Sequence, residues 1–327
     1  MYIPPFTLSA KAVNLIAEIS ALLEHFTLKE VADHELRLRK VNRIKTIHSS
    51  LAIEGNKLSE DQVADIINGK NVVAPLREIQ EVKNAIQVYD IYDTLNPFKE
   101  KDLLKAHSIM MQALIETPGR YRSGGVGVYG EKGLVHMAPP AQRVPLLMGE
   151  LFEWLAKAED NLLVRSCVFH YEFEFIHPFM DGNGRVGRLW QSLILGKLNP
   201  VFSHLPVENM IHANQQEYYN AIAASTAKAD SGPFIDFMLG EIAKTLRDSK
   251  VTNKVTNKVT NKSDIKALEI ISGNPNITIN GLMEQLNLSE SGIKKILARM
   301  TAAGLIKREG SRKNGRWVLL FDFNDLK

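Results

Sequence analysis

The unit Val-Thr-Asn-Lys is written three times in succession at residues 251–262, and this repeat constrains the fold more than any other feature of the chain. It is poor in large apolar side chains, so it cannot bury enough surface to offset the entropy lost on ordering. We therefore predict an extended linker at residues 249–262, with a polar continuation of the preceding helix as the alternative. The length of 327 residues is consistent with a separate domain on each side.

Upstream of the repeat, apolar residues recur every three or four positions, as on the buried face of an amphipathic helix. Leu15, Ile19 and Leu22 follow this spacing, and so do Ile47 and Leu51. The same pattern predicts further helices at residues 60–68, 78–95, 100–115, 145–157 and 162–176. The fold class we expect is therefore mainly α.

Residues 118–140 interrupt the helical pattern with glycines and two short β-prone stretches, 126–129 and 134–137. A Gly-Glu-Lys-Gly segment joins the two stretches and predicts a small β-hairpin. Residues 125–130 also satisfy G-x-G-x-x-G, but a dinucleotide fingerprint opens a helix, and here a second β-prone run follows. We interpret that match as accidental, and the chain contains no Walker A motif and no kinase catalytic loop.

Residues 177–188 read His-Pro-Phe-Met-Asp-Gly-Asn-Gly-Arg-Val-Gly-Arg. Pro178 disfavours helical torsion angles at His177, so the preceding helix should end near Ile176 and leave the imidazole at the entrance of a loop. An imidazole has an ordinary pKa of about 6.5 and can therefore remove a proton from a hydroxyl group at neutral pH.

The second half of this segment has the composition of an anion-binding loop. Gly182 and Gly184 flank Asn183, which frees the backbone to turn its amides inward at the start of a new helix. Arg185 and Arg188 fall on its first turn, where a phosphate would meet two cations.

Asp181 precedes this loop, and its carboxylate is well placed to bind Mg²⁺ that bridges the phosphates of a nucleotide. Together with His177, the segment indicates phosphoryl-group transfer.

The same string matches the signature of the Fic family at all eight fixed positions of a twelve-residue window. The resemblance implies a helical core over residues 99–248 that transfers AMP from ATP to a Ser, Thr or Tyr hydroxyl of a protein target, or of itself, and releases pyrophosphate. It implies that His177 is the general base, that Asp181 binds Mg²⁺, and that the ATP phosphates are bound by Gly182, Asn183, Gly184, Arg185 and Arg188.

The resemblance extends to the hairpin, which looks like the flap that holds a target segment by strand addition. The implied docking residues are Gly125, Val126, Gly127, Val128, Leu134, Val135 and His136. Gly119 and Arg122 also fit the family pattern just before the flap. Tyr218, Tyr219 and Asn220 fall where the family places a helix near the adenine and ribose, with aromatic packing in the core as the alternative.

A second match lies far upstream, within the helical region 1–98. The pattern (Ser or Thr)-x-x-x-Glu-(Gly or Asn) marks an inhibitory helix found in many Fic proteins, and Ser50, Glu54 and Gly55 fit it. The resemblance places this helix at about residues 43–55. Ser50 and Glu54 are four residues apart and would share one face of a helix that ends at Gly55. The resemblance implies that Glu54 pairs with Arg188 and so restrains transfer. An exposed Ser and Glu on a helix surface is the alternative.

Downstream of the repeat, residues 264–271, 280–286 and 290–303 are predicted helices, followed by a β-hairpin. This order resembles a winged helix-turn-helix domain at residues 263–327. The net charge of the whole chain is only +3, yet residues 294–316 contain eight Lys or Arg against one acidic residue. Candidate DNA contacts are therefore Lys294, Lys295, Arg299, Arg312, Lys313 and Arg316. A module for protein interaction or dimerisation is the alternative.

The single cysteine, Cys167, excludes an intramolecular disulfide, and we expect it to be a core thiol. We expect the protein to lie in a reducing cytoplasmic compartment and to have no membrane span. Cys167, His170, Glu174 and His177 recur at helical spacing, but four ligands on one straight helix cannot surround a tetrahedral metal ion.

The resemblance leaves other functions open. One is a DNA-binding transcriptional regulator whose Fic core senses nucleotide, and another is a Fic enzyme that removes AMP or transfers a different group. The sequence also leaves open whether the chain forms a homo-oligomer.

Overall fold

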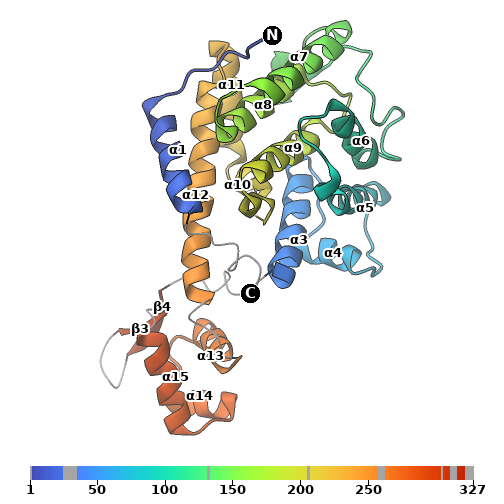
Figure 1. Ribbon diagram of the computed structural model, residues 1–327. Coiled ribbons are helices and arrows are strands. Elements are labelled where there is room, and N and C mark those ends of the chain that lie inside the picture. Colours follow the sequence, from blue (N-terminus) through green and yellow to red (C-terminus); the bar gives the residue numbers. More distant parts are fainter. Residues whose placement is uncertain are drawn as a thin grey trace. The chain divides into compact units, whose positions relative to one another are not determined.

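A computed structural model describes residues 2–24, 35–130, 133–204, 207–256, 262–302, 305–309 and 315–320. The chain divides into two compact units, Met1–Thr245 and Leu246–Lys327 (Figure 1). Both are mainly helical, and each contains one small antiparallel β-hairpin, so the predicted fold class is confirmed. The four segment boundaries proposed from the sequence (1–98, 99–248, 249–262 and 263–327) stay predictions.

The first unit is built from helices that follow one another with short connections. Its first half contains α1 (Ala10–Leu23), α3 (Glu35–Ile53), α4 (Glu60–Ile67), α5 (Leu76–Asp90) and α6 (Glu100–Met110). Its second half contains α7 (Val144–Lys157), α8 (Leu162–Ile176), α9 (Asn183–Leu198), α10 (Val207–Ala213), α11 (Gln215–Lys228) and the beginning of α12 (Gly232–Thr256), which continues past the end of the first unit at Thr245. Short 3₁₀ turns lie at Tyr92–Thr94, Ala141–Arg143 and Pro200–His204.

Helices α8 and α9 form the centre of this unit and pack against each other. Both are buried on nearly all sides, which requires apolar residues around the whole circumference of each helix. Phe169, Phe173, Leu189 and Trp190 are fully enclosed, and the Trp190 indole N–H donates to the carbonyl of Pro97 at 3.0 Å. The loop between these two helices is thereby fixed by the core of the unit, and it carries residues 177–182.

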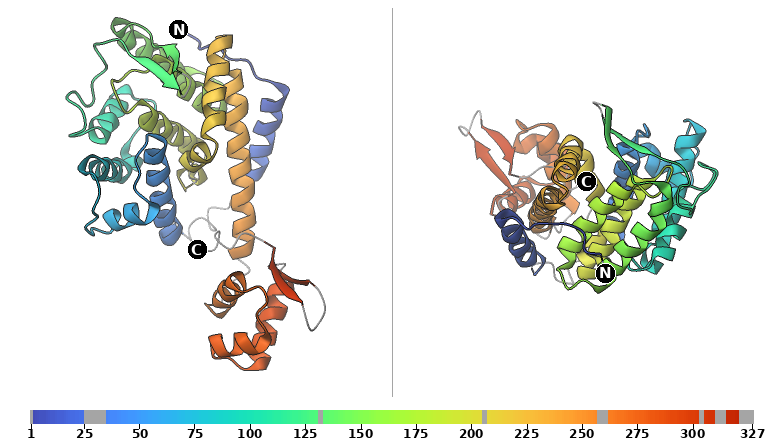
Figure 2. Two further views of the ribbon diagram at one scale, coloured as in Figure 1. Left: turned by 180° about the vertical axis from the view of Figure 1, so that it is seen from behind. Right: turned by 90° about the horizontal axis from the view of Figure 1, so that it is seen from above.

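The N-terminal segment is held against α12. The Thr7 hydroxyl donates to Asp230 at 2.6 Å, and the Ser9 hydroxyl donates to Asp236 at 2.6 Å. Ser9 also caps α1 by accepting from the amide of Ala12 at 3.0 Å. The two helices accordingly lie side by side (Figure 2).

The predicted hairpin consists of β1 (Gly127–Gly130) and β2 (Gly133–Met137), paired antiparallel with Gly127 opposite Met137. The register shifts between Val128 and Tyr129. Residues 131–132 of the expected turn lie outside the described residues.

The prediction of an extended repeat is wrong for residues 251–256, because α12 continues to Thr256. The helix begins in an apolar segment of the first unit and runs on through the polar Val-Thr-Asn-Lys units, which was the alternative. Extending an existing helix by one residue costs less conformational entropy than nucleating a new helix, so a polar segment can continue a helix that is already formed. The rest of the repeat, residues 257–261, lies outside the described residues.

The second unit has the predicted order of helices and strands. It contains α13 (Lys262–Gly273), α14 (Ile279–Leu286), α15 (Glu290–Ala302), β3 (Ile306–Glu309) and β4 (Arg316–Leu319). Ser289 caps α15 by accepting from the amide of Gly292 at 3.2 Å. A separate apolar core lies beneath these elements and includes Leu268, Ile293 and Trp317. This is the architecture of a winged helix.

In the part of the chain that the structure describes, no helix combines the length and the apolar character needed to cross a membrane.

Candidate functional site

His177 lies at the junction between α8 and the loop that follows it. As predicted, α8 ends at Ile176, and His177 adopts a left-handed conformation with φ 49° and ψ 62°. Its backbone N–H donates to the carbonyl of Phe173 at 2.9 Å and closes the helix. Because Pro178 cannot continue the helix, the imidazole is presented at the mouth of the loop.

Arg122 fixes this junction to the base of the hairpin. Its guanidinium is 4% exposed and donates to the carbonyls of His177 at 2.8 Å and Ile176 at 3.2 Å. It also donates to Gly124 at 2.8 Å and Pro139 at 2.5 Å, one on each side of the hairpin. One buried arginine therefore holds the carbonyls at the end of α8 and both ends of the hairpin in one arrangement.

The loop before α9 is closed by Asn183. Its side-chain amide accepts from the Phe179 N–H and donates to the Phe179 carbonyl, both at 2.9 Å. This side chain is buried and engaged with the backbone, so only the main chain of Asn183 is available for an anion. Gly182 has φ 85°, and a Cβ there would lie 2.6 Å from the sulfur of Met111, so this position requires glycine.

His107 packs against the same loop, and its role there was not predicted from the sequence. Its ring stacks on Phe179 with centroids 3.6 Å apart, and Nδ1 accepts from the Gly119 N–H at 2.8 Å. Nε2 then donates to the carbonyl of Asp181 at 3.0 Å. Burial lowers the pKa of His107 to about 4, so the ring stays neutral and keeps this tautomer.

Arg188 is 1% exposed and is held by the end of α3. It donates from Nη2 to Glu54 Oε1 at 2.8 Å and to the carbonyl of Ser50 at 2.9 Å, with the Ser50 hydroxyl 3.4 Å from Nε. Although burial disfavours the charged guanidinium, Glu54 raises the pKa of Arg188 above its ordinary value. Gly55 follows with φ 89° and ends the turn as predicted.

The Glu54 carboxylate also reaches the loop of glycines. A Cβ placed on Gly184 would overlap Glu54 Oε1 and would lie 2.9 Å from Arg188 Nη1. An internal carboxylate therefore occupies the space in front of the predicted anion-binding residues.

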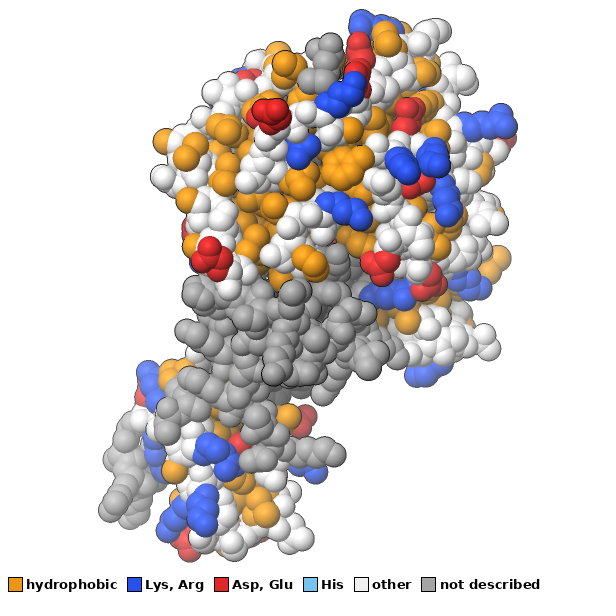
Figure 3. Space-filling model, viewed as in Figure 1, with side chains coloured by type: hydrophobic (Ala, Val, Ile, Leu, Met, Phe, Trp, Pro, Cys, Tyr) orange, Lys and Arg blue, Asp and Glu red, His pale blue; other side chains and the backbone are white. Residues whose placement is uncertain are grey.

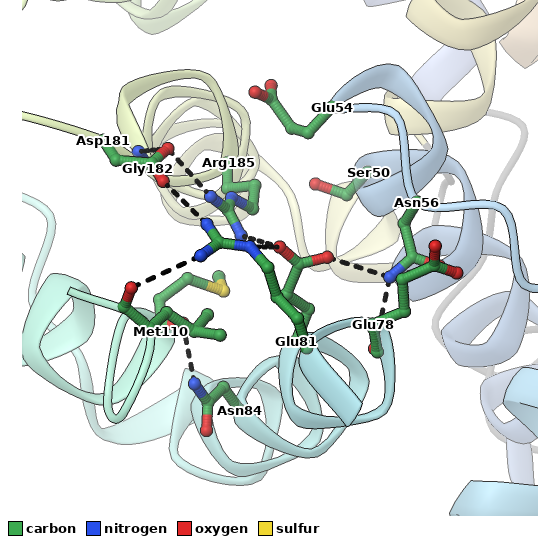
Figure 4. A network of polar contacts seen from close by, with 12 residues as sticks. Ser50, Glu54, Asn56, Glu78, Glu81, Asn84, Met110, Asp181, Gly182 and Arg185 are labelled. Atoms are coloured by element: carbon green, nitrogen blue, oxygen red, sulfur yellow. Dashed lines mark hydrogen bonds and ion pairs between the residues drawn. The ribbon is translucent and has the colours of Figure 1, made fainter. Parts of the chain in front are cut away.

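Arg185 is 3% exposed and lies between two carboxylates, at 3.1 Å from Asp181 and 3.5 Å from Glu81 of α5 (Figure 4). Its Nε and Nη1 are buried and make no hydrogen bond within the described residues, and the nearest carboxylate to Nη1 is that of Glu81 at the ion-pair distance of 3.5 Å. Buried donors without an acceptor are costly, so a phosphate oxygen at this place would satisfy them.

The α5 side chains around Arg185 were not predicted from the sequence. Arg77 lies 3.2 Å from the other oxygen of Asp181. Asn56 donates to Glu81 at 2.9 Å (Figure 4). No local signature marks them, because each belongs to an ordinary polar position and acquires its partner only when α5 packs beside the loop.

Comparison with known proteins places this site in context. A sequence model described as the Fic/DOC family matches residues 97–195, and one described as winged helix-turn-helix DNA-binding matches residues 260–307. The crystal structure of a Fic family protein from Desulfovibrio desulfuricans is similar to this chain, with 42% sequence identity and a TM-score of 0.75. The match covers 98% of this chain and 99% of that chain. The chain belongs to the Fic family.

Curated Fic relatives are more distant. A protein of Aquifex aeolicus named "Probable protein adenylyltransferase" is 31% identical over 58% of this chain and 58% of its own. The protein adenylyltransferase Fic of Drosophila mojavensis is 27% identical over 64% of this chain and 42% of its own. The chain thus spans about two fifths to three fifths of the length of these two relatives.

The aromatic cluster on α11 of this Fic protein is divided. Tyr218 is buried, and its hydroxyl lies 2.9 Å from Nε2 of the buried His170, so it belongs to the core. Tyr219 is 41% exposed and accepts from Gln215 at 3.3 Å, and Asn220 is exposed and accepts from Gln216. Of the three predicted nucleotide contacts, only Tyr219 and Asn220 reach the surface.

Cys167 is fully buried, and burial raises the pKa of its thiol to about 12, as a core thiol requires. Within the described ranges no cluster of three or more His, Cys, Asp or Glu side chains could hold a metal ion.

The predicted DNA contacts lie in different environments. Lys294 and Lys295 are exposed on α15, and Lys294 pairs with Glu290 at 2.6 Å. Arg299 donates to the buried Asp264 of α13 at 2.8 Å and so joins two helices of the winged helix. Arg316 is 64% exposed and lies 3.3 Å from Glu309, whereas residues 312 and 313 lie outside the described residues. Several basic side chains lie on the visible face of this unit (Figure 3).

Proposed function

We propose that this chain is a protein adenylyltransferase that transfers AMP from ATP to a hydroxyl group of a protein target or of the chain itself. The observation that carries the proposal is the placement of His177 at the mouth of a glycine loop with two buried arginines, of which Arg185 has unsatisfied donors. The names of the curated relatives support the same activity.

In this reaction the hydroxyl oxygen of the target forms a bond to the α-phosphorus, and the bond from that phosphorus to the bridging oxygen breaks. Pyrophosphate leaves with the electron pair, and the hydroxyl proton passes to His177. Arg185 and Arg188 would bind the phosphate oxygens, and the backbone of Gly182–Gly184 would add N–H donors. The hairpin would hold the target segment by strand addition.

We assign Mg²⁺ to Asp181. Its carboxylate supplies hard oxygen ligands and is 38% exposed, and Mg²⁺ would take the place of Arg77 or Arg185 at one of its two oxygens. When bound, the ion would neutralise charge on the phosphates.

We further propose that Glu54 inhibits transfer. While Glu54 holds Arg188 and stands against Gly184, the γ-phosphate of ATP cannot reach that arginine, and ATP is restricted to a pose unsuited to in-line attack. Displacement of the α3 terminus would relieve the inhibition.

The position of the label tests the proposal. Purified protein is incubated with Mg²⁺ and host lysate, once with ATP labelled at the α-phosphate and once with ATP labelled at the γ-phosphate. We expect protein bands labelled only by the α-labelled ATP, with pyrophosphate released, and mass spectrometry should find added AMP on Ser, Thr or Tyr. Labelling by γ-labelled ATP would instead indicate phosphate transfer and contradict the proposal.

DNA binding by the second unit is a further candidate function, favoured by the exposed lysines of α15 and by the matching winged helix-turn-helix model. Lys294→Glu combined with Lys295→Glu should weaken DNA binding by the full chain at least tenfold. It should also lower the slope of log affinity against log salt by about one for each phosphate that is no longer neutralised. Fluorescence anisotropy at several salt concentrations measures both the affinity and the slope.

A matched control is Lys101→Glu with Lys105→Glu, which places the same charge change on exposed positions of α6. Equally weakened binding in both double variants would show that only the total charge matters and would contradict a DNA site on α15.

A further inference from the structure

A carboxyl group lies beside His177 and has no part in the mechanism described so far. Glu174 is in the last turn of α8, and its Oε2 is 3.8 Å from His177 Nδ1. The backbone carbonyl of Glu174 is 3.4 Å from the same nitrogen. Glu174 therefore faces the Nδ1 side of the imidazole with both its side chain and its main chain.

The other oxygen of this carboxyl group points toward α9. Glu174 Oε1 is buried and makes no hydrogen bond to any residue that the structure describes. A Cβ on Gly187 would lie 2.7 Å from this oxygen, so the absence of a side chain at Gly187 provides its space. Because Gly187 lies on α9 between Arg185 and Arg188, the carboxyl group stands between the imidazole and the phosphate-binding helix.

The charges around Glu174 come from three other elements. Arg188 of α9 favours its ionised form, and Glu54 at the end of α3 opposes it. Tyr218 and Tyr219 of α11 are also within electrostatic reach. Burial is the largest effect and raises the pKa of Glu174 to about 8, so the group changes charge in an accessible pH range.

We propose that Glu174 is a positioning residue for His177, which orients the imidazole through Nδ1 and stabilises the imidazolium formed during transfer. The inference rests on the proposed adenylyl transfer. As the target oxygen bonds to the α-phosphorus and pyrophosphate departs, the hydroxyl proton arrives on Nε2 while Nδ1–H faces Glu174. The carboxylate then offsets the new positive charge, as the third member of other nucleophile–base arrangements does.

Glu172 provides a matched control on the same helix. It is 6% exposed, and burial raises its pKa to about 7, so it is also a buried glutamate that ionises late. Its position two residues earlier turns it away from the face of Glu174, toward the N-terminal Tyr2, whose pKa is raised mainly by burial and also by Glu172. A general effect of buried glutamates on α8 would therefore appear equally in Glu172→Gln.

The test compares Glu174→Gln, Glu174→Asp and Glu172→Gln, each combined with Glu54→Gly in the full chain, in AMP transfer from α-labelled ATP with Mg²⁺. Glu174→Gln should lower kcat about 10- to 100-fold and leave KM for ATP within twofold, because the residue acts on the base rather than on the nucleotide. Around pH 8, above the range in which an ordinary imidazole loses its proton, the parent rate should rise with pH as Glu174 ionises. This rise should be absent in Glu174→Gln and partly retained in Glu174→Asp.

The neutral amide is close in shape to the protonated acid, so the glutamine variant should fold, and circular dichroism checks this. Unchanged kcat and pH dependence in Glu174→Gln, or an equal decrease in Glu172→Gln, would overturn the inference. A raised KM with unchanged kcat would assign Glu174 to nucleotide binding and would also overturn it. Absence of transfer in the parent would count instead against the proposed function.

Discussion

Replacing His177 by alanine is expected to lower AMP transfer by about 10²- to 10⁴-fold, the contribution typical of a positioned general base. Two buried imidazoles of the described core are poorly placed to substitute: His107 is buried behind Phe179, and burial lowers its pKa to about 4, while His170 is enclosed with Gln191 and Tyr218. The rate is best measured with α-labelled ATP in the Glu54→Gly background, where the signal should be larger.

An asparagine variant separates chemistry from folding. His177 has a left-handed backbone, which asparagine tolerates better than alanine, and Arg122 binds the backbone carbonyl of this residue rather than its side chain. His177→Asn should therefore keep the thermal stability of the parent and still be defective in transfer. Substantial transfer by a folded asparagine variant would show that another group accepts the proton.

The central part of the site could be predicted because its residues are close together in the sequence. Pro178 after an apolar helix predicts the end of α8, and glycines on both sides of Asn183 predict a turn into a new helix. Local steric rules act over a few residues, so the structure agrees with them. Helix geometry predicts only that Ser50 and Glu54 share one face, whereas the pairing of Glu54 with the distant Arg188 was implied by the resemblance to the Fic family.

The supporting residues could not be predicted in this way. His107, Arg77 and Glu81 come from α5 and α6. His107 and Arg77 contact Asp181 in the loop before α9, and Glu81 contacts Arg185 in the first turn of α9, only after the first unit has packed. A single polar residue on a helix surface has no periodic signal that shows whether its side chain will contact another residue or remain in solvent. The side-chain contacts of Asn183 could not be predicted for the same reason, because its amide forms hydrogen bonds with Phe179 that depend on the closed loop.

Replacing Glu54 by glycine is expected to raise AMP transfer about tenfold to a hundredfold. Hydrogen bonds to charged groups contribute about 1.5–3 kcal/mol, and the bond from Arg188 to Glu54 is the contact that ATP must displace at this arginine. Removal of the carboxylate also clears the space in front of Gly184. The increase should appear mainly in kcat, because the γ-phosphate is needed for the productive pose; initial rates over a range of ATP concentrations measure it.

Ser50→Ala serves as the control for this prediction, because the two residues of the pattern hold Arg188 by different groups. Arg188 donates to the Ser50 carbonyl at 2.9 Å, whereas the hydroxyl is 3.4 Å away, and alanine retains the carbonyl. We therefore expect Ser50→Ala to raise transfer less than threefold. If the two variants had equal effects, loosening of the α3 terminus rather than the carboxylate would explain the activation. An unchanged rate in Glu54→Gly would refute inhibition by Glu54, because Arg188 would then be available to ATP without any gain in transfer.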